Sequence, residues 1–200
     1  MEAFDRSVYE TYEWDDFWME KAKRPEGKRV LYIGDSIARG TRRLATARSE
    51  ERLLFDGYST SKGIDNPWLK EQLRLIAQQC WPPAAVLFNS GLHGWHLDPG
   101  DYGARFEDML LFLKELFPGT PLFPVLTTAV ASEKGKAVVE ARNRAVLMLA
   151  EKHGLPVIDL HAVSQSRGDF ISGDGIHPTP EGYGLLAEAI LSALREKGIW

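Results

Sequence analysis

The sequence contains a single cysteine, Cys80, among its 200 residues. One cysteine excludes an intramolecular disulfide framework and any zinc site built from cysteine ligands. A chain of this length buries roughly 70% of the surface that it exposes when unfolded. We therefore expect one domain that folds without a metal ion or a disulfide.

The sequence also lacks a large net charge and a long apolar run. It has 24 basic and 28 acidic residues and a formal net charge of −4, which does not favour a nucleic-acid partner held by bulk electrostatics. No apolar run approaches the ~20 residues needed to cross a bilayer. The N-terminal residues are acidic and polar where a signal peptide would be basic and apolar. We expect a cytoplasmic protein with neither a nucleic-acid nor a membrane partner.

Charge is unevenly distributed over the first quarter of the chain. The first twenty residues hold seven acids and one arginine, whereas residues 21–52 hold ten basic residues and four acids. This asymmetry is typical of a docking arm or an anionic-ligand surface, and equally of a solvated helix followed by a basic surface. Aromatic residues are dense between Tyr9 and Trp18 and suit an amphipathic helix. We predict a helical N-terminal arm over residues 1–28, which offers a route to oligomers, and a single domain over 29–200.

Short apolar runs alternate with longer amphipathic segments after Gly27. The predicted strands cover residues 30–33, 53–58, 85–89, 122–127 and 156–160. The predicted helices cover residues 37–47, 67–79, 102–117, 133–152 and 181–197. This alternation indicates βαβ units and a parallel sheet covered on both faces. The fold class is therefore α/β, a three-layer α/β/α sandwich with a flavodoxin-like five-stranded parallel sheet.

A serine follows the first predicted strand. In such sheets functional residues collect at the carboxyl ends of the strands, and here the sequence reads GDSIARG from Gly34 to Gly40. The spacing of the glycines and the missing lysine exclude a phosphate-binding P-loop. Ala38 stands where a nucleophile elbow needs its second glycine. Ser36 at a helix N-terminus then either caps the helix or faces a developing negative charge.

A second polar motif lies near the other end of the chain, in the loop SGDGIHPTP over residues 172–180. Asp174 and His177 are three residues apart, so the carboxylate can reach the imidazole. That contact would fix the tautomer and support an imidazolium, as a general base requires. Alone, this pair is equally compatible with a surface loop, but the predicted topology places it at the same sheet edge as Ser36.

The segments VLYIGDS (residues 30–36) and DGIHPTPEGY (residues 174–183) resemble the first and last sequence blocks of the SGNH, or GDSL, hydrolases. With the alternation between them, the resemblance covers about residues 29–197. It implies an esterase or acylhydrolase with Ser36 as nucleophile, His177 as general base and Asp174 as the orienting acid. It implies no metal and no organic cofactor.

The middle of the chain departs from the family pattern. Family members place a glycine after the second strand, where its amide donates to the oxyanion, and Gly63 fits this position. After the third strand the family usually shows Gly-x-Asn-Asp. Here Gly91 takes the place of the glycine, His93 that of the asparagine and Gly94 that of the aspartate.

An imidazole can donate a hydrogen bond to an oxyanion where an asparagine amide would. We therefore predict an oxyanion hole made by the Ser36 and Gly63 amides and the His93 ring. Asn89 on the third strand and Asn66 in the second loop are alternative donors. A purely structural role for His93 also stays open.

Substrate choice rests on weaker signals. Trp95 and His96 lie beside the predicted oxyanion hole, where the indole suits a sugar face or an acyl pocket, and equally the core or a lid. The short chain favours a small acyl group, such as acetyl, on a carbohydrate. The basic residues Arg39, Arg42 and Arg43 favour an acidic or phosphorylated ester instead. A lysophospholipase or thioesterase, an acyltransferase, and a non-catalytic binding module on this fold are the alternatives.

Overall fold

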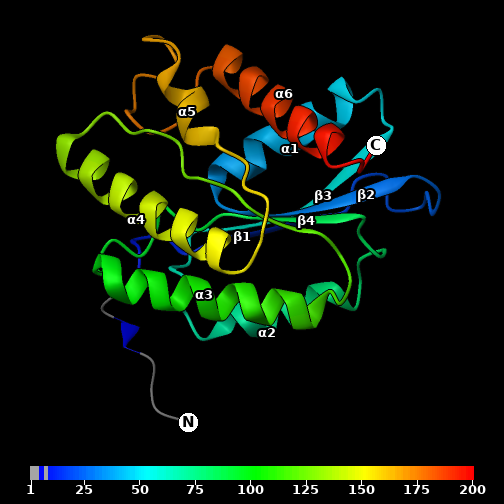
Figure 1. The fold of residues 1–200 in the computed structure, drawn as a ribbon, viewed down its shortest axis with the longest axis horizontal. Coiled ribbons are helices and arrows are strands. Elements are labelled where there is room, and N and C mark those ends of the chain that lie inside the picture. The colour runs from blue at the N-terminus through cyan, green and yellow to red at the C-terminus, as the bar shows by residue number, and fades with distance from the viewer. Residues whose placement is uncertain (1–4, 7–8) are drawn as a thin grey trace.

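A five-stranded sheet with helices on both faces forms the centre of the computed structural model, which describes residues 5–6 and 9–200 (Figure 1). The strands are β1 (Asp15–Trp18), β2 (Lys28–Gly34), β3 (Leu53–Thr60), β4 (Ala85–Phe88) and β5 (Leu122–Pro124). The helices are α1 (Ser36–Arg48), α2 (Trp68–Ala77), α3 (Pro99–Leu116), α4 (Glu133–Lys152), α5 (Leu160–Gln165) and α6 (Pro180–Glu196). Helices α1, α5 and α6 cover one face, and α2 and α3, with α4 packed on α3, cover the other.

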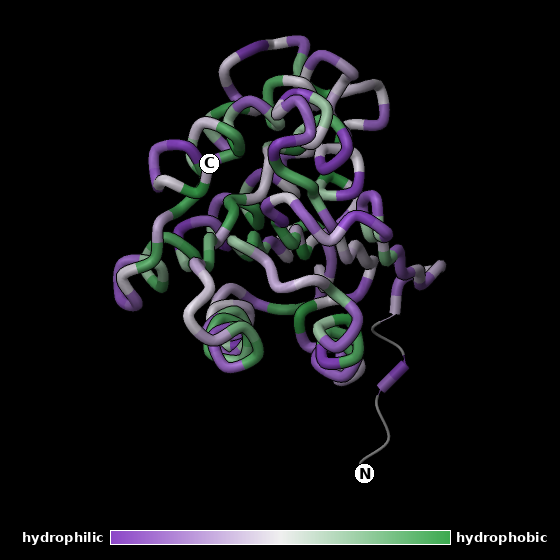
Figure 2. The backbone as a smooth tube through the Cα atoms, turned by 90° about the vertical axis from the view of Figure 1, so that its right-hand side faces the viewer, coloured by the Kyte–Doolittle hydropathy of each residue, from purple (hydrophilic) through white to green (hydrophobic). Residues whose placement is uncertain are grey.

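The order of the strands confirms the predicted three-layer α/β sandwich. The sheet runs β1-β3-β2-β4-β5, and the pairs β3–β2, β2–β4 and β4–β5 are all parallel. This is the flavodoxin-like order, with β2 as its first strand. Hydrophobic positions gather in the strands and on the helix sides that face them, while the outer sides are hydrophilic (Figure 2). In the part of the chain that the structure describes, no helix is both long and apolar enough to cross a bilayer.

The predicted strand over residues 156–160 is wrong. This segment keeps only one parallel bridge to the sheet, between Val125 and Ile158, with the Ile158 amide 3.0 Å from the Pro124 carbonyl. Directly afterwards the Asp159 carboxylate accepts the Ala162 amide at 2.8 Å and starts α5. Because this side-chain cap diverts the chain into a helix, the fifth position of the parallel sheet is reduced to a single bridge.

The predicted helix in the N-terminal arm is also wrong, and with it the all-parallel sheet. No α-helix occurs among residues 5–6 and 9–28; instead β1 pairs antiparallel with β3, from Asp15 opposite Thr60 to Trp18 opposite Gly57. The parts of the predicted arm at residues 1–4 and 7–8 lie outside the described residues. The strand forms because β3 would otherwise leave its edge amides and carbonyls unpaired.

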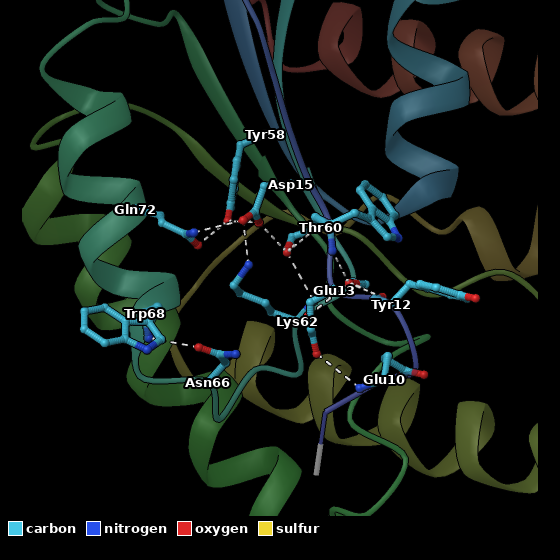
Figure 3. A network of polar contacts seen from close by, with 12 residues as sticks. Glu10, Tyr12, Glu13, Asp15, Tyr58, Thr60, Lys62, Asn66, Trp68 and Gln72 are labelled. Atoms are coloured by element: carbon cyan, nitrogen blue, oxygen red, sulfur yellow. Dashed lines mark hydrogen bonds and ion pairs between the residues drawn. The ribbon is translucent and has the colours of Figure 1, made fainter. Parts of the chain in front are cut away.

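A polar network fastens β1 to its neighbours (Figure 3). The Asp15 carboxylate accepts hydrogen bonds from Lys62 at 2.6 Å, Tyr58 at 2.7 Å, Thr60 at 2.8 Å and Gln72 at 2.9 Å. Burial opposes the ionisation of Asp15, but these donors together hold its pKa below the ordinary value. Strand β1 is thus held to its neighbours by the ionised Asp15 side chain as well as by the backbone hydrogen bonds of the sheet.

A buried ion pair fixes the chain between β1 and β2. Arg29 on β2 donates to Asp56 on β3 at 2.8 Å, and both side chains are almost fully buried. The same guanidinium donates to the carbonyls of Glu20, Lys21 and Arg24. A single arginine side chain therefore fixes the segment that joins β1 to β2, through hydrogen bonds to its carbonyls.

Candidate active site

Ser36 lies where the resemblance places the nucleophile, at the first position of α1 directly after β2. Asp35 caps the helix, because its Oδ1 accepts the Ile37 amide at 2.8 Å. Burial raises the pKa of Asp35, and its second oxygen has no hydrogen-bond partner among the described residues. As the capping role belongs to Asp35, the Ser36 hydroxyl is free for other contacts, and its amide is one of the donors that a helix start leaves without an internal acceptor.

The structure brings the three predicted residues of the triad together. The Ser36 hydroxyl lies 2.8 Å from Nε2 of His177, and Nδ1 of the same ring lies 2.7 Å from Oδ2 of Asp174. The pKa of Asp174 is well below its usual range because the Ile176 and His177 amides and the His177 ring donate to it. An ionised Asp174 accepts a hydrogen bond from Nδ1–H of His177, and this fixes the tautomer in which Nε2 is free to accept the serine proton.

A tight turn ahead of α6 carries Asp174 and His177. The Ser172 amide donates to the His177 carbonyl at 2.7 Å, and Gly175 takes a φ of 76°, a conformation that side chains rarely adopt. Oδ1 of Asp174 accepts the amides of Ile176 and His177 at 2.8 and 2.9 Å. The carboxylate thus shapes the turn with one oxygen and orients the imidazole with the other.

Gly63 lies where the loop after β3 meets the loop after β4. A Cβ atom at Gly63 would stand 2.7 Å from Oδ1 of Asp65 and 3.0 Å from the Cα of Gly94. Gly94 itself has a φ of 65°. The two loops can approach this closely only because both positions are glycine. The assignment of the Gly63 amide to an oxyanion hole stays a prediction.

His93 lines a small cavity at the carboxyl edge of the sheet, together with Asp35, Asn89 and Lys62 among others. Its Nδ1 lies 3.2 Å from the Glu10 carboxylate, so the N-terminal segment reaches over to this loop. The nearby His93 ring lowers the pKa of the buried Asp35, against the larger effect of burial, which raises it. The ring lines the same cavity as Gly34 and Asp35, which directly precede Ser36, and its role as oxyanion donor stays a prediction.

The two asparagines considered as alternative donors serve other contacts. Asn89 is buried and donates both amide hydrogens, to the Val125 carbonyl at 2.8 Å and to the Thr127 hydroxyl at 3.0 Å. The Asn66 side chain accepts the Trp68 amide at 3.0 Å and so shapes the start of α2 (Figure 3). Because both hydrogens of the Asn89 side-chain amide are already donated, this residue is disfavoured as an oxyanion donor.

Neither Trp95 nor His96 lines the groove that Ser36 and His177 line. Trp95 is 41% exposed, and its ring packs against the Arg142 guanidinium 5.4 Å away. His96 contacts the carboxylate of Asp65 at 2.8 Å. Neither is among the residues that line the groove, so a substrate contact for either stays a prediction without geometric support.

Arg142 is a residue of this site that sequence reasoning missed. It is 1% exposed and donates to three carbonyls of the loop after β4, those of Gly91 at 3.0 Å, His93 at 2.8 Å and Gly94 at 2.6 Å. Its guanidinium also lies 4.6 Å from the Tyr102 ring centroid. One buried arginine therefore holds the loop that carries His93.

A groove opens in front of Ser36, with a volume of about 860 Å³. Ser36, His177 and Tyr183 line one part of it. The rest of its lining is Asp16, Trp18, Arg39, Gly40, Arg42, Arg43 and Leu44. A ring of Tyr183 fits there because Gly40 has no side chain; a Cβ would stand 2.4 Å from that ring. The groove gives a substrate direct access to the Ser36 hydroxyl.

A serine, an imidazole and a carboxylate hydrogen-bonded in this order are the arrangement of the serine hydrolases. The chain belongs to the GDSL-like lipase/acylhydrolase family, whose model matches residues 32–185. It is 43% identical to an acetylxylan esterase of Xylanibacter ruminicola, over 89% of this chain and 46% of that protein. It thus spans about half the length of this curated relative.

Solved structures share the fold at low identity. A GDSL-like lipase from Bacteroides thetaiotaomicron superposes with a TM-score of 0.69 and 16% identity, over 85% of this chain and 89% of that chain. A variant of an acetyl xylan esterase from Geobacillus stearothermophilus gives a TM-score of 0.65 and 17% identity, over 86% and 97%. These similarities show that the fold predicted from the alternation of strands and helices is shared with solved structures of GDSL-like lipases and acetyl xylan esterases.

Proposed function

We propose that the protein is a serine esterase that removes a small acyl group, acetyl, from a carbohydrate through an acyl-enzyme. The observation that carries this proposal is the continuous contact from the Ser36 hydroxyl through the His177 ring to the Asp174 carboxylate, at 2.8 and 2.7 Å. Similarity to an acetylxylan esterase supports both the acyl group and the class of alcohol.

In the first half of the reaction the Ser36 oxygen attacks the ester carbonyl as Nε2 of His177 takes its proton. The ionised Asp174 stabilises the resulting imidazolium. The carbonyl oxygen becomes an oxyanion, to which we expect the Ser36 amide at the start of α1 to donate a hydrogen bond. Gly63 and His93 are the further donors that we expect, and one such donor typically contributes ~2.7–4 kcal/mol to transition-state stabilisation.

The tetrahedral intermediate collapses when the bond to the sugar oxygen breaks and His177 returns the proton to that oxygen. The alcohol leaves, and the acyl group stays bound to Ser36 as an ester. A water molecule then gives its proton to His177 and attacks this ester. The second intermediate collapses to the free acid, and His177 returns the proton to the Ser36 oxygen, so the reaction as written needs no cofactor.

The lining of the groove favours a polar alcohol over a long acyl chain. Five of its ten lining residues carry ionisable side chains of aspartate, arginine or histidine. A long hydrocarbon chain would have to displace the water around these groups without supplying hydrogen bonds, which is unfavourable. A sugar presents hydroxyl groups that replace this water.

The test is a comparison of Ser36→Ala with the control Ser192→Ala, which changes an exposed serine of α6. We expect Ser36→Ala to lose about 10⁴-fold or more of kcat on acetylated xylo-oligosaccharides, and a fluorophosphonate to label only proteins that keep Ser36. Ser192→Ala should match the wild type in both assays. Full turnover by Ser36→Ala would refute the mechanism, and saturable turnover of an acyl-CoA or a lysophospholipid alone would refute the substrate class.

A further inference from the structure

The groove extends from the nucleophile along one side of α1. Ser36, Arg39, Gly40 and Arg43 are spaced by three, four and seven residues, so they share one face of the helix. With a rise of 1.5 Å per residue, Arg43 lies about 10 Å from Ser36 along the helix axis. A substrate whose ester reaches Ser36 therefore extends past these arginines.

The lining side chains carry more positive than negative charge. One carboxylate, that of Asp16 on β1, is shared by Arg42 at 2.7 Å and Arg39 at 3.1 Å. Arg43 forms no ion pair or hydrogen bond with any residue that the structure describes, and its guanidinium lies 5.7 Å from the Trp18 ring. Three guanidinium groups thus face a single carboxylate in the groove.

Arg42 is buried in the wall of the groove, and the described residues supply too few hydrogen-bond acceptors for its guanidinium. Its side chain is 3% exposed, and its Nε and Nη1 atoms have no hydrogen-bond partner among the described residues. Burial lowers the pKa of Arg42, against the favourable charge of Asp16. A buried guanidinium remains charged and acts through a lower effective dielectric than a surface group, so it adds a positive field to the groove.

We propose that this part of the groove is a subsite for an anionic group on the alcohol side of the ester, bound by Arg43 and Arg39. The chemistry that fits is a carboxylate or a phosphate, because a guanidinium fork binds both through paired hydrogen bonds. On a carbohydrate the carboxylate is that of a uronic acid, and this is the group to which we commit. The inference rests on the proposed function, since it assumes that the acyl carbonyl lies at Ser36.

The first experiment compares kcat/KM for three substrates: an acetylated xylo-oligosaccharide, the same oligosaccharide with a glucuronic acid side group, and an acetylated sugar phosphate. We expect the wild type to prefer the uronic acid substrate over the neutral one about tenfold, which corresponds to about 1.4 kcal/mol. This preference should vanish between about 0.01 M and 1 M salt, where the Debye length falls from about 30 Å to 3 Å. If the wild type preferred only the acetylated sugar phosphate over the neutral substrate, the ligand of the subsite would be a phosphate, and the assignment of a uronic acid carboxylate would be refuted.

The variant Arg43→Gln tests the residue, and Arg105→Gln is its control, because Arg105 is an exposed arginine on α3. We expect the ratio of kcat/KM for the charged over the neutral substrate to fall about tenfold in Arg43→Gln. The control should keep the wild-type ratio. An unchanged ratio in Arg43→Gln, or no preference in the wild type at low salt, would overturn the subsite.

Binding to Ser36→Ala separates this inference from the proposed function. Calorimetry with the glucuronic acid oligosaccharide should show binding by Ser36→Ala that the additional Arg43→Gln change weakens about tenfold. Hydrolysis of the neutral ester by Ser36→Ala would refute the assignment of Ser36 as nucleophile but would not contradict the anion subsite. Equal binding with and without Arg43 would refute the subsite and leave the esterase standing.

Discussion

Replacing Arg142 by methionine is the perturbation that tests how the loop after β4 is held. The change removes three hydrogen bonds from a charged donor to the carbonyls of Gly91, His93 and Gly94. Each such bond contributes about 1.5–3 kcal/mol, so the three together contribute about 5–9 kcal/mol. Removing the guanidinium also ends the cost of burying it, which is several kcal/mol. We expect a net loss of about 3 kcal/mol in the free energy of unfolding.

The assay is urea unfolding, with Arg144→Met as the control because Arg144 is an exposed residue of the same helix. For Arg142→Met the midpoint should fall by about 1–3 M urea, since the denaturant slope is typically about 1–3 kcal/mol per M. The control should unfold close to the wild type. A wild-type midpoint for Arg142→Met would refute the claim that this arginine holds the loop.

Activity distinguishes a positioning residue from a merely stabilising one. Below the unfolding transition, a loop displaced by about 1 Å should lower kcat for an acetyl ester about 10²-fold. If His93 is the donor through which Arg142 acts, then Arg142→Met should cost little further kcat in a His93→Ala background, because the two changes remove one function. Full additivity in this double-mutant cycle would contradict that connection.

Three further outcomes are expected. Gly63→Ala places a methyl group 3.0 Å from the Cα of Gly94 and so displaces the amide of residue 63. We expect kcat to fall about 10²–10³-fold with KM nearly constant. A wild-type kcat would exclude that amide from the oxyanion hole. Although burial opposes it, hydrogen bonds from Lys62 and its neighbours hold the pKa of Asp15 below the unfolded value of about 3.9. The unfolded state then binds more protons, so Asp15 stabilises the fold above pH ~4 and loses this effect as pH falls through the folded pKa. Wild type and Asp15→Asn should therefore differ in urea stability at pH 7 and converge in acid, and a difference that persists there would contradict this account. Asp56→Asn leaves a buried arginine without its charge partner and should cost about 3–5 kcal/mol by thermal unfolding, whereas a loss below about 1 kcal/mol would show that the pair is not needed.

The sequence was sufficient for the features that depend on local signals. A buried apolar run that ends at Gly34 predicts β2 and the turn that presents Ser36, and the Gly- and Pro-containing loop predicts the turn that presents His177. The two turns meet because Ser36 begins α1 and His177 directly precedes α6, and these two helices pack against each other. The α4 helix has the predicted bounds, since its apolar periodicity and the stop at Gly154 act within a single segment.

The features that the sequence did not predict depend on tertiary partners. Residues 15–18 combine acids and aromatics in a pattern compatible with a helix or a strand, and the free edge of β3 decides between them. Arg142 shares a helical stripe with the buried Val139 and Val146, which is the signal that marks it as facing inward. The three carbonyls that it binds come from a loop about fifty residues away, and no local pattern encodes that contact.

The contact between Ser36 and His177 joins positions that are 141 residues apart in the chain. Ser36 begins α1 and His177 precedes α6, so this contact forms only when these two helices lie against each other on the sheet. Closing so long a loop is entropically costly and comes after local contacts in folding. The proposed esterase activity should therefore depend on the docking of α6 against α1. We expect it to return later in refolding than the circular dichroism of the helices does, and proteolysis within the loop over residues 166–172 to abolish it.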